Sequence, residues 1–201
     1  MIKLYGLRQS RALRSLWALE ELGVPYELVP VDFATDAKKP EYLAINPNGR
    51  VPALVDGDVT LCESMAINLY LARRYDKQGL WPKSPSDEGR AFQWSFWGMT
   101  EIEPSLLQVL LNRVFLPEPQ RDAALAKAGE EKLAQPLRVL DAALAGRKHL
   151  LGETFTIADL NLASILAWAL FARLDLSKTP NVERWLRACC ARPAFTKAQR
   201  G

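Results

Sequence analysis

Residues 46–64 read NPNGRVPALVDGDVTLCES, and this stretch decides how the N-terminal part of the chain folds. Two short apolar runs flank residues 56–58 (Asp-Gly-Asp), a pattern typical of a tight turn between paired antiparallel strands. Pro52 stands directly before the first run, where a proline cannot donate a backbone hydrogen bond to a central strand. Two explanations are open: a trans proline that opens an edge strand, or a cis Val51–Pro52 bond, which is uncommon among X–Pro bonds in general.

The sequence before this stretch alternates between strand and helix patterns. Residues 2–5 (IKLY) predict a short strand, and residues 10–23 follow with apolar side chains on one broad helical face. Gly23 and Pro25 mark the end of that helix, because glycine suits the left-handed cap conformation and proline cannot continue a helix. Residues 26–33 (YELVPVDF) predict a second strand. The order is therefore β-α-β, which implies a parallel, right-handed crossover.

The sequence after the stretch completes a small domain. Residues 63–75 (ESMAINLYLARRY) carry helical apolar spacing and include two arginines in the last turn, where cations favour the helix dipole. Residues 77–86 are rich in lysine, proline, glycine and serine, which predicts an exposed linker. We therefore expect an α/β domain of βαβ-ββα order over residues 1–76.

The remaining sequence predicts helices alone, with no convincing strand pattern. Three segments carry helical apolar spacing, namely residues 92–112, 131–144 and 157–174. The third segment is apolar almost all round, which predicts a buried central helix. Thr156 and Asp159 stand at its start with the spacing of a capping box. The expected second domain is therefore an all-α helical bundle over residues 87–201.

The composition is that of an ordinary globular chain and argues against several kinds of partner. Of 201 residues, 49% are hydrophobic and 24% are charged, which is enough apolar material for a sizeable core. The net charge is only +3, with acidic and basic residues interleaved, so we expect no nucleic-acid partner. Neither a signal-peptide core nor an apolar stretch of membrane-spanning length is present, so we expect no membrane association. Three cysteines without a disulfide framework favour the reducing cytoplasm.

The single histidine argues against several reaction types. His149 lies in the basic segment GRKH, which predicts a surface loop, and a Ser–His catalytic triad would have to use it. No cluster of acidic residues or cysteines with zinc-ligand spacing accompanies it. We therefore expect no metal site, and a reactive group that is borrowed from a ligand.

Three motifs in register along essentially the whole chain resemble the cytosolic glutathione transferases: YGLRQSRALRSLWALEELGVPYE, NPNGRVPALVDGDVTLCES and FTIADLNLA. The resemblance implies a thioredoxin-like first domain and a detoxification enzyme that adds the glutathione thiolate to a small hydrophobic electrophile. It also implies a homodimer, with glutathione as a co-substrate and no metal or redox cofactor. Two alternatives stay open: a non-catalytic binding or scaffold protein of the same fold, and a glutathione-dependent peroxidase, isomerase or dehalogenase.

The resemblance implies a glutathione site around the opening stretch. A cis bond before Pro52 turns the backbone of Val51 outward, where it pairs with the cysteinyl part of glutathione as an added strand does. Arg50 is placed to pair with the glycine carboxylate, and a solvated arginine is the alternative. Ser64 is implied to donate to the γ-glutamyl α-carboxylate at a helix N-terminus, and Glu63 to accept from the α-ammonium. Plain helix capping by Ser64 is compatible with that role.

Ser10 is the candidate catalytic residue. A free cysteine thiol has a pKa of ~8.5, whereas the thiolate is the nucleophile, so a hydroxyl donor at the positive end of a helix would favour the reactive form. Tyr5, Ser10 and Arg14 have the spacing of the serine-type, theta- and phi-like branches of the family. Two alternatives stay open: that Ser10 is only a helix cap, and that Tyr5 is the donor, as in other branches. Arg11 is placed to add positive potential, and a solvated arginine is the alternative.

The electrophile is expected to contact the loop after the first strand and the first long helix of the second domain. Leu7 lines that loop together with Arg8 and Gln9. Trp97 and Arg113 are the candidate contacts from the helical domain. The alternative for Trp97 is a core position, because aromatic residues at helical spacing more often pack in a core.

Overall fold

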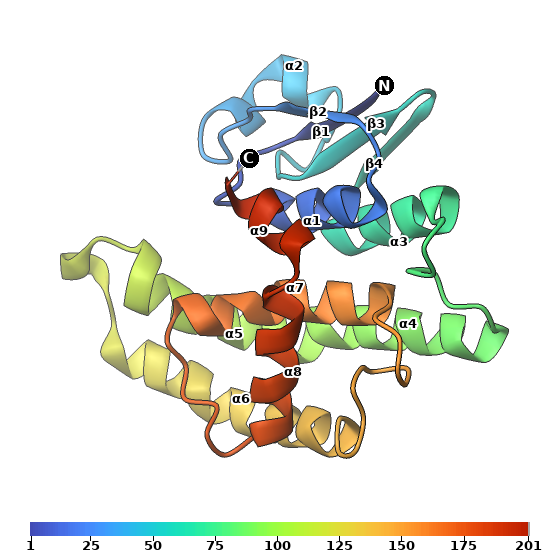
Figure 1. Ribbon diagram of the computed structural model, residues 1–201. Coiled ribbons are helices and arrows are strands. Elements are labelled where there is room, and N and C mark those ends of the chain that lie inside the picture. Colours follow the sequence, from blue (N-terminus) through green and yellow to red (C-terminus); the bar gives the residue numbers. More distant parts are fainter. Residues whose placement is uncertain (201) are drawn as a thin grey trace. The chain divides into compact units, whose positions relative to one another are not determined.

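A computed structural model describes residues 1–200, which divide into two compact units (Figure 1). Unit 1 comprises residues 1–81 together with the C-terminal segment from Arg192, and unit 2 comprises residues 82–191. All the strands belong to unit 1, and unit 2 is helical. The expected order of an α/β domain followed by an all-α domain is therefore confirmed.

Unit 1 is built on a mixed four-stranded sheet with the strand order β2-β1-β3-β4. The strands are β1 (Ile2–Tyr5), β2 (Tyr26–Val29), β3 (Ala53–Asp56) and β4 (Val59–Cys62). β1 pairs with β2 in parallel, as the βαβ pattern requires, and with β3 in the antiparallel sense. β3 and β4 form the expected hairpin, in which Asp56 lies opposite Val59.

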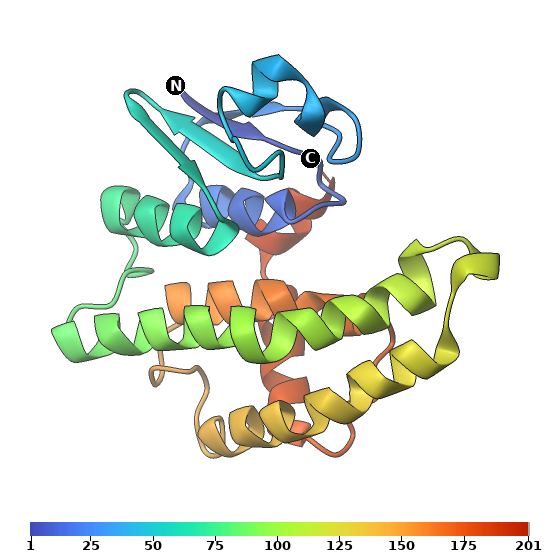
Figure 2. The ribbon, with the colours of Figure 1, turned by 180° about the vertical axis from the view of Figure 1, so that it is seen from behind.

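Helices cover both faces of this sheet. The helices of unit 1 are α1 (Ala12–Leu22), α2 (Pro40–Leu43), α3 (Ser64–Tyr75) and α9 (Pro193–Arg200), with a short 3-10 turn η1 (Asp36–Lys38) before α2. Figures 1 and 2 show α1 and α3 against one face and α2 on the other. Gly23 ends α1 in the left-handed conformation (φ 63°), as its place in the sequence predicts.

Unit 2 is a bundle around one buried helix. Its helices are α4 (Pro85–Trp97), α5 (Glu103–Leu110), α6 (Ala123–Ala143), α7 (Ile157–Phe171) and α8 (Pro180–Cys190). Two π-helical turns, η2 (Gly98–Ile102) and η3 (Leu111–Phe115), continue α4 and α5, and a short 3-10 turn, η4 (Glu118–Gln120), precedes α6. In Figure 2 the run from α4 to η3 lies beside α7. Nearly every residue of α7 is buried, and its predicted capping box is present.

Two boundaries differ from those expected. The last helix of the chain, α9, belongs to unit 1, and the first helix of unit 2, α4, begins earlier than expected. The sequence places residues 87–201 in the helical domain, whereas α9 packs on α1 in unit 1. The physical reason is an aromatic contact between Phe195 and Trp17, whose ring centroids are 4.6 Å apart. In addition, α4 begins inside the expected linker, because the Ser84 side chain accepts a hydrogen bond from the Asp87 N–H at 3.1 Å and caps the helix.

No helix among residues 1–200 is long and apolar enough to cross a membrane. The same residues contain no group of three or more His, Cys, Asp or Glu side chains that could hold a metal ion. The three cysteines are free thiols. Burial raises the pKa of the Cys190 thiol to about 12, so this thiol stays protonated near neutral pH.

Candidate functional site

Ser10 closes a tight turn between β1 and α1. Its backbone N–H and its hydroxyl both donate to the Leu7 carbonyl, at 3.0 Å and 2.6 Å. The same Oγ accepts a hydrogen bond from the Ala12 N–H at 3.1 Å, at the N-terminal end of α1. Arg11 occupies the cap position itself and makes no side-chain cap bond. Ser10 therefore lies where the helix dipole is positive, one residue before the position of a plain cap.

Gly6 brings Ser10 close to Val51. Gly6 has φ +144°, a backbone conformation that residues other than glycine rarely adopt. A Cβ atom on Gly6 would lie 2.7 Å from Ala12 Cβ, 3.4 Å from Val51 Cβ and 3.5 Å from Ser10 Oγ. Ser10 and Val51 thus flank the same glycine, although 41 positions of sequence separate residue 10 from residue 51.

The Val51–Pro52 peptide bond is cis, as expected. Two side chains hold the residue before it, since the Arg50 carbonyl accepts from the Tyr42 hydroxyl at 2.6 Å and from the Asn46 amide at 2.7 Å. Burial raises the pKa of Tyr42 to about 12, so this hydroxyl keeps its proton and remains a donor near neutral pH. Within residues 1–200, Val51 makes no backbone hydrogen bond outside the regular helices and strands. The Arg50 side chain is exposed.

Glu63 and Ser64 form the N-terminal end of α3. Glu63 has φ 69°, and a non-glycine residue in so sparsely populated a region costs on the order of 1–3 kcal/mol. Ser64 is the first residue of the helix and is only 3% exposed, whereas the Glu63 side chain is exposed. The strained conformation at Glu63 is of the kind found at ligand sites, and it supports a functional interpretation of this pair.

Two cations lie near these residues, and neither is among the binding residues that the sequence predicts. Arg14 is 2% exposed, and its Nη1 donates to the Ser64 hydroxyl at 3.5 Å. Lys38 donates to the Gly49 carbonyl at 2.6 Å, next to Arg50. Arg14 has the spacing of the serine-type branches, but no local pattern indicates its contact with Ser64. Lys38 lies in the connection before β3, where no periodic pattern marks a single lysine.

The three residues expected to contact the electrophile lie in different units. Leu7 is half-buried in the turn of unit 1 that Ser10 closes. Trp97 ends α4 in unit 2 and packs edge-to-face against Trp94, with ring centroids 5.2 Å apart. Arg113 lies in the π-helical turn η3 of the same unit. Trp97 therefore makes the aromatic contact of a packed residue while remaining partly exposed.

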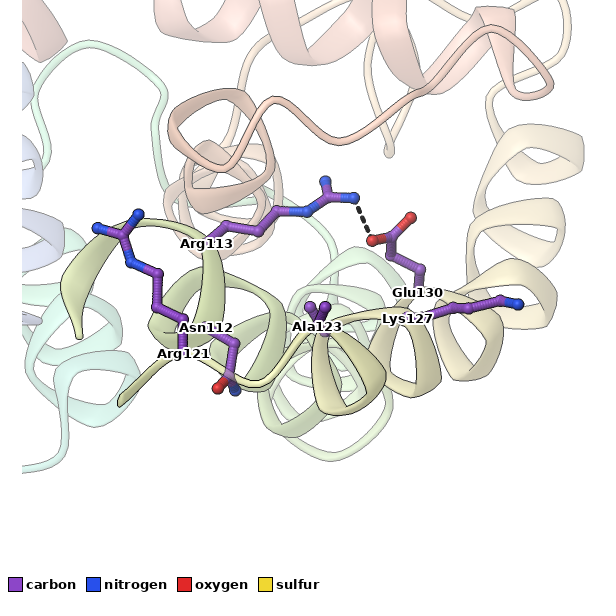
Figure 3. Close-up of a pocket in the computed structure, with 7 residues that line it drawn as sticks. Asn112, Arg113, Arg121, Ala123, Lys127 and Glu130 are labelled. Atoms are coloured by element: carbon purple, nitrogen blue, oxygen red, sulfur yellow. Dashed lines mark hydrogen bonds and ion pairs between the residues drawn. The ribbon is translucent and has the colours of Figure 1, made fainter. Parts of the chain in front are cut away.

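Arg113 lines a cavity of about 380 Å³ in unit 2 (Figure 3). The lining residues are Asn112, Arg113, Arg121, Ala123, Ala126, Lys127 and Glu130. Arg113 forms an ion pair with Glu130 and donates to the Ala172 carbonyl at 3.3 Å. Arg121 instead donates to the Leu116 carbonyl at 2.8 Å, and Figure 3 shows its guanidinium directed away from that of Arg113. Both arginines of the cavity are therefore engaged within the unit.

His149 is not in an exposed loop, contrary to the expectation from its basic surroundings. It is only 9% exposed, and its ring packs edge-to-face against Phe155. Its backbone pairs with that of Gly152. Its Nδ1 lies 3.6 Å from a carboxylate oxygen of Asp159. His149 thus belongs to the buried surroundings of the α7 cap in unit 2, and Ser10 lies in unit 1.

Comparison with known proteins gives the same family for both units. Residues 1–73 match the family described as the glutathione S-transferase N-terminal domain, and residues 102–193 match the corresponding C-terminal domain. Glutathione S-transferase 3 of Zea mays is 39% identical over 211 residues, which cover 98% of this chain and 92% of that protein. Glutathione S-transferase GstB of Escherichia coli (strain K12) is 34% identical over 202 residues, with 98% and 97% covered.

Solved structures agree with these relatives. The crystal structure of the theta class glutathione S-transferase from the citrus canker pathogen Xanthomonas axonopodis pv. citri, with glutathione bound, superposes with a TM-score of 0.91. It is 31% identical, and the superposition covers 100% of this chain and 97% of that one. The two matched domains, the thioredoxin-like sheet order and the full-length relatives lead to one conclusion: this chain belongs to the glutathione S-transferase family and is phi/theta-like.

Proposed function

We propose that this glutathione S-transferase binds glutathione in unit 1 and uses the Ser10 hydroxyl to stabilise the glutathione thiolate. One observation carries the proposal: Ser10 at the positive end of α1 and Val51 before the cis proline flank the same glycine. A cysteinyl backbone paired with Val51 therefore has its sulfur within reach of a hydroxyl and of a helix N-terminus. Both interactions favour the anion over the neutral thiol.

The rest of the tripeptide is proposed to lie along the segments on either side of Pro52. The N–H and C=O of Val51 pair with the cysteinyl backbone in the manner of an added strand. Two exposed cations suit the glycine carboxylate: Arg50, and Lys38, whose ammonium donates to the carbonyl of the neighbouring Gly49. Glu63 and Ser64 receive the γ-glutamyl end, where the first N–H groups of α3 and its dipole favour a carboxylate.

Stabilisation of the glutathione thiolate requires the Ser10 hydroxyl to rotate. Its hydroxyl proton donates to the Leu7 carbonyl, which also accepts the Ser10 N–H. Rotation of the hydroxyl toward sulfur therefore leaves that carbonyl with one donor rather than none. The thiol proton leaves to solvent, the sulfur lone pair forms the new bond to carbon, and the leaving group departs with its bonding electrons. No metal or redox group takes part in this proposed reaction.

The second substrate is proposed to be a small hydrophobic electrophile, and the process a cytoplasmic detoxification. Leu7, Trp97 and Arg113 remain its proposed contacts, and the partly exposed aromatic surface of Trp97 supports an apolar ligand. A homodimer is proposed as the working state. These parts rest on the family resemblance and on the chemistry of the residues.

A conjugation assay tests the proposal. The intact chain is incubated with a chloronitrobenzene, with and without glutathione, and its retention on glutathione resin is measured in parallel. We expect glutathione-dependent conjugation together with retention. Retention without conjugation of any of several aryl and alkyl electrophiles would favour a binding or scaffold role. A chain that neither conjugates nor binds the resin would overturn the glutathione site.

A further inference from the structure

The C-terminal helix α9 is held on α1 by charged and aromatic contacts. Lys197 lies 2.6 Å from a carboxylate oxygen of Glu20, which is largely buried. Arg192 forms an ion pair with Glu21, and Glu21 also accepts a hydrogen bond from the Trp17 indole at 3.1 Å. The Phe195 ring also packs against Trp17. These two ion pairs and this ring contact hold α9 in unit 1.

A second contact joins α9 to the turn that carries Ser10. The Arg8 guanidinium donates to the Ala198 carbonyl at 2.5 Å, across 190 positions of sequence. Ala198 lies in the last turn of α9, where helix carbonyls are free to accept and where the dipole favours a cation. Arg8 is the second residue of the turn from Leu7 to Ser10, which the Ser10 N–H closes at 3.0 Å. The guanidinium therefore anchors that turn from one side, while the Leu7 carbonyl fixes Ser10 from within.

A tyrosine shares the Glu20 carboxylate with α9. The Tyr26 hydroxyl donates to Glu20 at 2.6 Å, on the carboxylate whose other oxygen meets Lys197. Burial and the Glu20 hydrogen bond raise the pKa of Tyr26 to about 12, against the opposing influence of the nearby Arg8. The Glu20 carboxylate therefore joins α9, α1 and β2 in one polar cluster.

We propose that Arg8 is a positioning residue through which the C-terminal helix α9 holds the turn that presents the Ser10 hydroxyl. This inference rests on the proposed role of Ser10 at the thiolate. It adds a structural role to the expectation that Arg8 lines the loop, because its guanidinium donates to the Ala198 carbonyl. Without the anchor, the turn samples orientations in which Ser10 Oγ does not face the sulfur, while Val51, Glu63 and Ser64 keep their own supports.

The test compares Arg8→Met with Arg8→Lys in the full-length chain. Methionine keeps the apolar stem and removes the donor, whereas lysine keeps a cation that can reach a carbonyl. We expect Arg8→Met to lower kcat roughly tenfold, the scale of one hydrogen bond to a charged group. The midpoint of the pH–rate profile should move to higher pH at the same time, because the thiolate is less stabilised. The affinity for glutathione should change little. Arg8→Lys should restore most of the rate. Arg200→Met, a change at an exposed arginine of the same helix, is the matched control.

A double variant separates this inference from the proposed function. If Arg8 acts through Ser10, then Arg8→Met adds little to the loss already caused by Ser10→Ala. If the rate losses of Arg8→Met and Ser10→Ala multiply in full in the double variant, the positioning role is overturned. An unchanged kcat and an unchanged pH–rate profile in Arg8→Met would also overturn it. If Ser10→Ala itself has no effect, the proposed catalytic role fails instead. Should Arg8→Met fold poorly, Lys197→Met serves as the second variant, since it loosens α9 from Glu20 and should shift the pH profile in the same direction.

Discussion

The Arg14 guanidinium donates a hydrogen bond to the Ser64 hydroxyl, with Nη1 3.5 Å from Oγ. Arg14 belongs to α1 and Ser64 opens α3, and both side chains are buried. One turn further along α3, the Asn68 amide donates to the Arg14 carbonyl at 3.3 Å. The helix that follows Ser10 and the helix that opens with Ser64 are thus joined by polar contacts. A buried cation lies beside the proposed γ-glutamyl site.

Arg14→Met is expected to weaken glutathione binding by at least about tenfold, because a hydrogen bond to a charged group is worth ~1.5–3 kcal/mol. Titration calorimetry measures the affinity, and circular dichroism checks that the variant is folded. Ser64→Ala weakens binding as well, and the double variant should lose less than the product of the two single losses, because both act at one hydroxyl. Full multiplication of the two losses would show that Arg14 and Ser64 act independently.

Glu63→Gly is expected to change stability and binding in opposite directions. Glycine adopts positive φ freely, so the variant should unfold at a higher temperature than the parent chain, whose Glu63 has φ 69°. The proposed contact with the α-ammonium is lost, so glutathione binding should weaken. Glu63→Gln, which keeps the backbone preference and removes the charge, is the matched variant for binding alone. Unchanged glutathione affinity in both variants would show that Glu63 does not contact the ligand.

Ser10→Ala is expected to raise the pKa of the bound glutathione thiol toward the free value of ~8.5. The thiolate then forms only at higher pH, so conjugation at neutral pH falls and the rise of the pH–rate profile moves to higher pH. Glutathione affinity changes little, because Val51, Glu63 and Ser64 are unaltered. Stopped-flow absorbance of the bound thiolate across pH measures the shift. An unchanged profile would mean that Ser10 is only a structural residue of its turn, and Tyr5 would be tested next.

Ser10→Cys extends the same argument with a different product. A thiol at the positive end of α1 should have a lowered pKa and form a mixed disulfide with glutathione. Mass spectrometry after incubation with oxidised glutathione detects the added tripeptide. Cys190 serves as the internal control, because burial raises the pKa of its thiol to about 12 and keeps it protonated. Modification at Cys190 but not at residue 10 would contradict the expected electrostatics of the turn.

Asp159→Ala is expected to destabilise unit 2 by at least ~3 kcal/mol, because hydrogen bonds to a charged group are worth ~1.5–3 kcal/mol each. The fully buried carboxylate accepts from the Leu150 N–H at 2.8 Å, the Trp185 indole at 2.9 Å and the Thr156 N–H at 3.0 Å. Denaturant unfolding followed by tryptophan fluorescence measures the change. Glu131→Ala, on an exposed site of α6, should leave stability nearly unaltered.

The protein is expected to be a homodimer in solution, with the glutathione domain of one subunit against the helical domain of the other. Sedimentation velocity over a series of protein concentrations measures the association state. A species with the mass of a single chain, 22.5 kDa, at micromolar concentration would contradict this prediction.

Local patterns were sufficient for much of the fold. The hairpin around residues 56–58, the end of α1 at Gly23 and the capping box of Thr156 and Asp159 all depend on neighbours within a few positions. Such interactions leave a readable signal, because turn and cap residues must occupy fixed offsets. The cis bond before Pro52 came from the family resemblance, since composition alone gives such a bond little weight.

By itself, the sequence determined the βαβ and ββα motifs of the first domain and the α/β-then-α organisation. It did not reveal the short helix α2 between the two motifs, and the roles of the candidate residues around Pro52 came from the family resemblance. Only the tertiary structure decided which distant residues meet: Arg14 with Ser64, Arg8 with Ala198, and Phe195 with Trp17. It also decided that His149 is buried and that α9 belongs with unit 1. The physical reason is that these contacts arise when separately formed elements pack together. A single arginine or histidine carries no periodic signal of the partner, many residues away, that burial will assign to it.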